Sequence, residues 1–289
     1  MLDEPRSGRL AAWGNALFAA LVSPDEAAQR IVGEDVVHRV VGLPASAGPY
    51  ADSEPEPVGL TLALGRLRSL GARGLRVALP VPGHPLGLSG PPEFNSSALE
   101  AGEAVIAVGA GTGLVPEIHE AGPQGDVHVE VTWRCLPVRE APPADVPSLG
   151  EAERELAEAM REATEVLTEL DVAGSGPAAD AALEAYRARM EAGRRLLAPG
   201  YPPRAVRVLE LGQRVRALVA IAYGEESGSG HAGGPGAGGA GDGREHGGAV
   251  SASQIAARAE ALRPVERTAR RAQVAAYNAY AEELERKRS

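Results

Sequence analysis

The chain has 289 residues, of which 44% are hydrophobic, 24% are charged and only 3% are aromatic. This composition excludes a fibrous, collagen-like or wholly disordered protein, and the length allows one or two domains with a sizeable core. The formal net charge of −10 argues against sequence-independent binding of nucleic acid, which depends on clustered basic residues. The single cysteine, Cys135, excludes an internal disulfide and a metal site built from cysteines.

The start of the chain is acidic, whereas a signal peptide starts with basic residues. No apolar run approaches the roughly 20 residues that a membrane-spanning helix needs. Lys287 is the only lysine among the 29 basic residues, and alanine, glycine and proline are abundant, a bias typical of a high-GC bacterial genome. We therefore expect a soluble cytoplasmic protein that contacts neither membranes nor nucleic acid.

Residues 1–140 carry helix and strand signals in alternation. Apolar residues at helical spacing, with Ser23 as an N-cap before the second segment, predict helices over 9–22, 24–33 and 60–70. Runs of β-branched and other apolar residues predict strands over 34–41, 75–81, 104–108, 114–120 and 127–138. Because the last two strands have the spacing of a hairpin, we expect an N-terminal α/β or α+β layer domain with a mixed sheet.

Prolines over 141–147 predict a linker, and the chain that follows is helical. We expect three helices within 148–224, then a disordered glycine-rich linker over 225–250 and a final helix within 251–289 that Pro264 kinks or divides. Small side chains along these helices fit a C-terminal antiparallel helical bundle. Since alanine supplies little apolar area, these helices could also pack on the first domain or on a second subunit as a homodimer.

The loop over 82–97 is the most suggestive segment for ligand binding, because it leaves the carboxyl end of a buried strand and enters a helix. A helix start offers unpaired N–H groups that suit an anion. The alternative is a proline-stiffened connection in which Asn95 or Ser97 only caps the helix. The candidate ligand-binding residues are His84, Ser89, Asn95, Ser96 and Ser97.

The predicted hairpin offers a candidate metal site. If Ile118 pairs with Val129, two pairs face each other on the polar side of the hairpin: His119 with His128, and Glu117 with Glu130. These side chains are suitable ligands for Zn²⁺ or another divalent metal and would support a metal-dependent hydrolase. The alternative is the ordinary solvated face of a half-buried hairpin, since the spacing matches no compact ligand motif.

Two other features favour structural interpretations. The glycines at 109, 111 and 113 do not have the spacing of a dinucleotide-binding loop, and no helix is predicted after them. They therefore predict a turn between strands. Cys135 falls on the apolar face of its strand and is expected to be a buried, inert thiol. No other catalytic motif is present in the sequence, and no cofactor is expected.

Four arginines of the final helix form a candidate interaction surface for an acidic partner: Arg263, Arg267, Arg270 and Arg271. They could instead pair internally with the acidic helix that begins at Leu149. We favour the internal pairing, because that helix carries a glutamate on nearly every turn.

Three stretches resemble a group of conserved proteins of high-GC, actinomycete-type bacteria with no established activity: 75–83, 98–105, and 261–267 together with 275–278. The resemblance covers most of the chain and implies no catalytic residue. Our first hypothesis is a non-enzymatic interaction or scaffold protein that acts through its helical bundle. The alternatives are a small-molecule binding protein or enzyme for an anionic ligand at the 82–97 loop, and the metal-dependent hydrolase. A pocket at that loop favours the ligand, and a large apolar patch on the bundle favours the partner.

Overall fold

The computed structural model describes residues 4–44, 56–123, 126–169, 198–223 and 252–286. The glycine-rich tract over 225–250 lies outside these residues, as does the middle one of the three helices predicted within 148–224. The described helices include none that is both long enough and apolar enough to cross a membrane.

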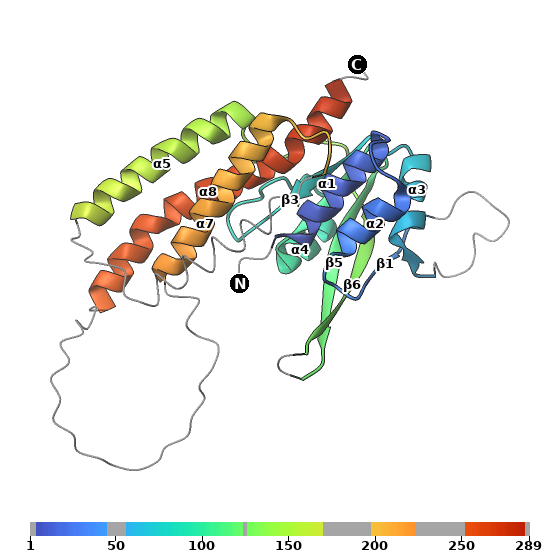
Figure 1. Ribbon diagram of the computed structural model, residues 1–289, viewed down its shortest axis with the longest axis horizontal. Helices are drawn as coiled ribbons and strands as arrows, with labels where there is room; N and C mark the ends of the chain where they lie inside the picture. Colours follow the sequence, from blue (N-terminus) through green and yellow to red (C-terminus); the bar gives the residue numbers. More distant parts are fainter. Residues whose placement is uncertain (1–3, 45–55, 124–125, 170–197, 224–251, 287–289) are drawn as a thin grey trace, which may run out of the picture.

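One mixed sheet organises the N-terminal half (Figure 1). Its strands, in spatial order, are β2 (Val58–Gly59), β1 (Val37–Val41), β6 (His128–Pro137), β5 (Thr112–Ala121), β4 (Ala104–Val108) and β3 (Gly74–Ala78). β1 and β6 pair in parallel, and every other pair is antiparallel. The mixed sheet expected from the sequence is therefore present, and β2 is a short edge strand that the sequence did not predict.

Seven helices surround or extend this sheet in the described part of the chain. They are α1 (Arg6–Phe18), α2 (Pro24–Val32), α3 (Leu60–Ser69), α4 (Pro92–Ala101), α5 (Leu149–Glu169), α7 (Pro203–Tyr223) and α8 (Ala252–Arg286). The predicted cap of α2 is confirmed, because the Ser23 hydroxyl accepts a hydrogen bond of 3.2 Å from the Glu26 N–H.

The sheet is covered on both faces. On one face, α1 packs against β3 and β4 and α3 against β1, around buried residues that include Leu10, Leu64 and Trp133. On the other face, Phe94 and Ala98 of α4 pack into a smaller cluster with strand residues. The result is a three-layer α+β arrangement, consistent with the alternation of helix and strand signals.

α8 connects the sheet to the other C-terminal helices. It contacts both α5 and α7, and it also packs against β3 and α1 (Figure 1). The helix is continuous through Pro264, so the predicted division into two helices does not occur. Residues 272–281 of α8 are buried throughout, because the sheet and helices enclose all sides of this segment.

Two asparagine side chains form hydrogen bonds with the backbone groups at the free edge of β3. The Leu75 N–H donates to Asn15 Oδ1 (2.7 Å), and Asn15 Nδ2 donates to the Leu75 carbonyl (2.9 Å). Asn278 of α8 makes the same pair of bonds with Val77, at 2.7 and 3.1 Å. Each side-chain amide thus replaces a neighbouring strand, and both helices are held against an edge that would otherwise offer unpaired backbone groups.

Candidate functional site

The predicted ligand loop borders a pocket of about 320 Å³. Val81 and His84 exchange two backbone hydrogen bonds, of 3.0 and 2.8 Å, around a tight turn in which Gly83 has a positive φ of 83°. This turn follows the end of β3 and brings His84 to the pocket, where Asn95 and Ser96 of α4 also lie. Three of the predicted ligand-binding residues therefore line one pocket.

The remaining details of this loop differ from the prediction. α4 begins at Pro92, so Asn95, Ser96 and Ser97 lie within the helix, and the capping role predicted for Asn95 or Ser97 is wrong. The side-chain oxygen of Asn95 instead accepts a hydrogen bond of 2.9 Å from the Gly90 N–H. Prolines at 91 and 92 set the helix start earlier, because their restricted φ suits the first helical positions. Ser89 and Ser97 do not belong to the pocket lining.

A chain of charged groups connects this pocket to the C-terminal helices. The Asp145 carboxylate lies 3.9 Å from His84 Nδ1, an ion-pair distance when the imidazole is protonated, and 3.3 Å from Arg271 Nε. Arg271 also pairs with Glu155 of α5 at 2.6 Å. This contact confirms the expected pairing between the last helix and the acidic helix for one of the four arginines.

The other three arginines occupy different environments. Arg263 is exposed and pairs with Glu260 of the same helix at 2.7 Å, and Arg267 is exposed. Arg270 is partly buried, and burial lowers its pKa. The predicted row is thus not one uniform basic surface, because α8 turns part of it toward the neighbouring helices.

The hairpin register assumed for the metal site is wrong by two residues. Ile118 lies opposite Val131, His119 opposite Glu130, Glu117 opposite Thr132, and Ala121 opposite His128.

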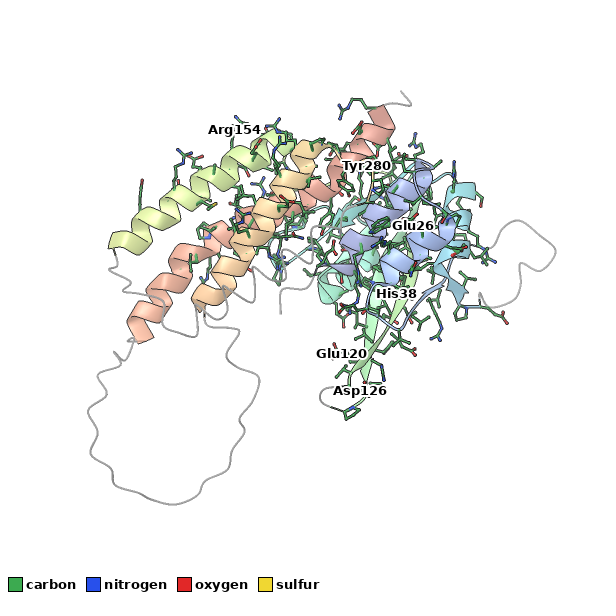
Figure 2. All side chains as sticks on the ribbon, viewed as in Figure 1. Glu26, His38, Glu120, Asp126, Arg154 and Tyr280 are labelled. Carbon is green, nitrogen blue, oxygen red and sulfur yellow. The ribbon has the colours of Figure 1, made fainter. Side chains whose placement is uncertain are left out.

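The carboxylates of the predicted metal site have other partners. Glu117 pairs with Arg134, and Glu130 pairs with Arg39 at 3.0 Å. His128 lies 3.8 Å from Asp126 near the hairpin tip, which Figure 2 shows extending away from the helices. No cluster of three or more potential ligands in the described residues could hold a metal ion.

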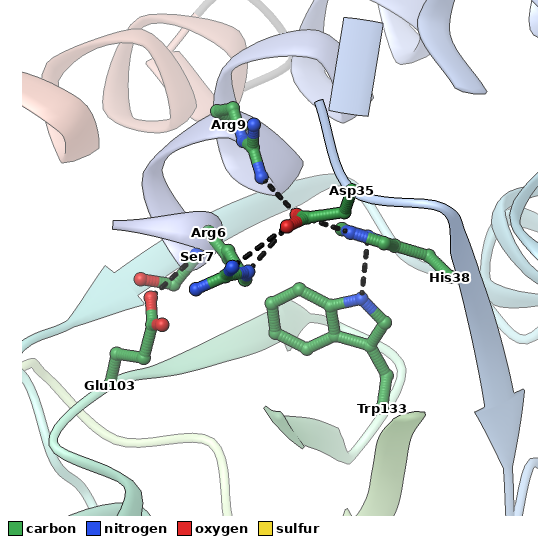
Figure 3. Close-up of polar contacts among 7 residues, drawn as sticks. All are labelled: Arg6, Ser7, Arg9, Asp35, His38, Glu103 and Trp133. Atoms are coloured by element: carbon green, nitrogen blue, oxygen red, sulfur yellow. Dashed lines mark hydrogen bonds and ion pairs between the residues drawn. The ribbon is translucent and has the colours of Figure 1, made fainter. Parts of the chain in front are cut away.

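A buried polar network that the sequence did not reveal lies beneath α1 (Figure 3). Asp35 accepts hydrogen bonds from Arg6 Nε (3.0 Å) and Nη2 (2.7 Å), and a further one from Arg9. His38, whose side chain is 0% exposed, lies 2.9 Å from Asp35 through Nε2 and accepts the Trp133 indole N–H at Nδ1 (3.2 Å). Both imidazole nitrogens are therefore occupied, with the proton on Nε2.

The pKa values of both Asp35 and His38 are lowered in this network. Burial acts to raise the pKa of Asp35, but hydrogen bonds from Arg6 and His38 and the charges of Arg6 and Arg9 lower it to about 2. Burial lowers the pKa of His38, although Asp35 opposes this effect. Asp35 is ionised and His38 neutral at pH 7, so the network joins α1 to β1 and β6 and leaves no imidazole nitrogen for proton transfer to a substrate.

A buried glutamate, Glu103, and a partly buried one, Glu4, lie at the start of α1. Glu103 accepts a hydrogen bond of 2.8 Å from the Ser7 N–H, so it satisfies a backbone group at the helix start that no local side chain caps. Burial raises the pKa of Glu103, and it raises the pKa of Glu4 to about 7 despite the nearby Arg9. Tyr277 of α8 donates to Glu4 at 3.4 Å, which adds a polar contact between the two ends of the chain.

Two sequence predictions about inert features are confirmed. Cys135 is a buried free thiol, and burial raises its pKa to about 12. Gly109 and Gly111, with φ of 86° and 62°, form the turn between the antiparallel strands β4 and β5. Gly109 must also stay small, because a Cβ there would lie 2.7 Å from the Gly71 carbonyl oxygen.

Comparison with known proteins identifies relatives along both halves of the chain. Family models described as the N-terminal and C-terminal domains of Rv1486c-like protein match residues 7–147 and 150–237. The chain is 32% identical to "Uncharacterized protein Rv1486c" of Mycobacterium tuberculosis, in an alignment that covers 74% of this chain and 82% of the relative. It is 30% identical to "Uncharacterized protein MAV321" of Mycobacterium avium, covering 74% and 78%.

A further relative, "Uncharacterized protein ML1804" of Mycobacterium leprae, is 26% identical over 93% of this chain and 95% of its own length. No solved structure matches the chain. The resemblance drawn from the three short stretches is confirmed, and no established activity accompanies it. With matches to both family models and a relative at 32% identity, the chain belongs to the Rv1486c-like family.

Proposed function

We propose that this protein binds a small anionic molecule in the pocket between the turn at His84 and helix α4. The observation that carries this proposal is the pocket of about 320 Å³ that His84, Asn95 and Ser96 line together. Its volume lies at the lower end of the range for small-molecule sites.

The chemistry of the pocket wall supports an anionic ligand. The imidazole of His84, the amide of Asn95 and the hydroxyl of Ser96 can each donate a hydrogen bond. The described residues that line this pocket include no acidic side chain, and the nearby Asp145 carboxylate lies 3.9 Å from His84 Nδ1. Val81, Leu88 and Leu99 provide an apolar wall for the rest of the ligand.

A thermal-shift screen of the full chain against nucleotides, phosphorylated metabolites and small carboxylates tests this function. A ligand present at about 100 times its Kd stabilises the folded state by roughly 2.7 kcal/mol. Ser96→Trp, at an exposed position of the pocket wall, should abolish the shift by filling the space, and His84→Gln should reduce it. The matched control is His119→Gln on the hairpin, which should leave the shift unchanged. Flat traces for every compound, or equal shifts for all three variants, contradict the proposal.

A second candidate function is contact with a protein partner through the helical part. The exposed Arg263 and Arg267 of α8 support it, since they suit an acidic surface, and the excess of acidic residues in the N-terminal half offers one on a second copy. In this proposal α5, α7 and α8 belong to an antiparallel helical bundle, and their mutual contacts support it. The large apolar side chains exposed in the described part of the chain all belong to the N-terminal half, so charge, not an apolar patch, carries this candidate.

Light scattering tests the second candidate. A homodimer at low ionic strength that becomes monomeric in the Arg263→Glu, Arg267→Glu double variant supports it, because these pairs are solvent-exposed and sensitive to salt. A monomer at every salt concentration contradicts the self-association. We also propose a cytoplasmic location, with which a single reduced and buried cysteine is consistent.

A further inference from the structure

A second cavity, of about 350 Å³, lies where the sheet, the segment after β6 and the end of α8 meet. It shares no lining residue with the His84 pocket. Its apolar wall includes Ile106 and Val108 of β4 and Val138, which follows β6. The charged residues of its lining come from three separate parts of the chain: Arg76 of β3, Arg139 and Glu140 after β6, and Glu285 of α8. Ligand sites occur preferentially at such junctions, and this volume fits a small molecule.

The acidic residues of this lining already pair with arginines. Glu285 already pairs with Arg76 at 2.8 Å, and Glu140 pairs with Arg73 at 2.7 Å. Arg139 is exposed, and no acidic group of the described residues forms an ion pair with it. Among the described residues, both acids of the lining have an arginine partner, and the guanidinium of Arg139 is available to an anion.

Arg76 contributes an unused donor. Its Nε–H is buried, and within the described residues it makes no hydrogen bond. A buried donor without a partner carries the full cost of its lost hydration, so an oxygen ligand that reaches it removes this cost. Guanidinium groups bind carboxylates well because their N–H groups match the spacing of the two oxygens.

We propose that this cavity binds a small carboxylate with an apolar body, such as a short aliphatic acid. The carboxylate interacts with Arg139 and the free Nε–H of Arg76, and the aliphatic part packs on Ile106, Val108 and Val138. Both properties are needed: the arginines attract any anion, whereas the apolar wall gains only from a hydrocarbon chain.

An NMR titration of the ¹⁵N-labelled full chain with sodium hexanoate tests this site. The amide signals of Gly109 and Gly111 in the cavity wall should shift and saturate as hexanoate is added. Concentrations up to the order of 10 mM are enough to detect a dissociation constant in the millimolar range. Hexanamide has the same hydrocarbon chain without the negative charge, so it tests whether binding needs the charge. Inorganic phosphate is an anion without a hydrocarbon chain, so it tests whether binding needs the apolar part. Each should bind at least tenfold more weakly than hexanoate.

Two variants locate the binding. Arg139→Gln removes the unpaired cation, and Ala141→Trp fills the cavity from an exposed position of its wall. Both should weaken hexanoate binding at least tenfold. The matched control is Arg134→Gln, which changes an exposed arginine of β6 outside the cavity and should alter the binding less than twofold.

The proposal is overturned if hexanoate produces no saturable shift at Gly109 and Gly111. It is equally overturned if hexanamide binds as well as hexanoate, or if Arg139→Gln and Arg134→Gln have the same effect. Because the cavity is separate from the His84 pocket, Ser96→Trp should leave this binding intact, so the two sites can fail independently.

Discussion

Replacing Asn278 by leucine should be one of the most destabilising changes of a single side chain in α8. Leucine has the same branched skeleton, but its methyl groups cannot bond the Val77 N–H and carbonyl, which Asn278 holds at 2.7 and 3.1 Å. Asn278 is 0% exposed, so water does not replace these bonds. Each orphaned backbone group costs about 1–3 kcal/mol, which gives a loss of roughly 2–6 kcal/mol in the free energy of unfolding.

Urea denaturation followed by circular dichroism measures this loss. Asn95→Leu is the matched control, because Asn95 makes a single, partly buried hydrogen bond to the Gly90 N–H and should cost about 1 kcal/mol. Hydrogen exchange adds a local readout. Backbone groups of an antiparallel strand point alternately to its two sides, so the Val77 amide should lose protection while the Arg76 amide, directed toward β4, keeps it.

Two results would refute the edge-capping argument. One is an Asn278→Leu variant no less stable than Asn95→Leu, and the other is unchanged exchange at Val77. Asn15→Leu should behave like Asn278→Leu, since Asn15 makes the same pair of bonds with Leu75. The double variant exposes the whole edge of β3 and should self-associate, which size-exclusion chromatography detects.

Three further predictions concern buried ionisable groups. Asp35→Asn should cost about 3–5 kcal/mol in urea denaturation, because it leaves Arg6 and Arg9 without their carboxylate, whereas Glu130→Gln at an exposed pair should cost under about 1 kcal/mol. The raised pKa of Glu4, about 7, means that the folded state binds this proton more tightly than the unfolded state. Stability should therefore fall by on the order of 3 kcal/mol as pH rises from the unfolded pKa through 7, and Glu4→Gln should remove this fall; equal pH profiles for variant and wild type would contradict it. Cys135, with a pKa of about 12, should not react with a disulfide reagent at pH 8 until urea unfolds the chain, and fast labelling of the folded protein would show that it is accessible.

Local signals in the sequence predicted much of the N-terminal half. Ser23 and Glu26 marked the start of α2, because the cap and its partner lie three residues apart. The glycines at 109 and 111 marked a turn, because their backbone conformation suits few other residues. Cys135 was assigned to the apolar face of β6 by alternation alone.

The hairpin register shows where such patterns stop being informative. A slip of one residue would turn every side chain to the opposite face, so alternation excludes it. A slip of two residues keeps each side chain on its face, and the pattern cannot detect it. The assumed pairing of Ile118 with Val129 therefore satisfied every sequence criterion, although Val131 is the true partner.

The candidate sites depended on tertiary structure to different degrees. The 82–97 loop could be singled out by its position after a strand, but only the fold shows that His84, Asn95 and Ser96 line one pocket and that Ser89 and Ser97 do not. The cavity at Arg76 and Arg139 joins residues from β3, the segment after β6 and α8. No spacing in the sequence links them.

The sequence by itself determined most of the described helices and strands and their buried faces, because capping and periodicity act over a few residues. Only the tertiary structure decided what covers the apolar face of α8 and which residues surround His38. Asn278 bonds to Val77, 201 positions away, and His38 accepts the indole N–H of Trp133, 95 positions away. Contacts at such separations depend on how the elements pack. The sequence around a polar residue in a strand or helix does not indicate which distant group its side chain will bond.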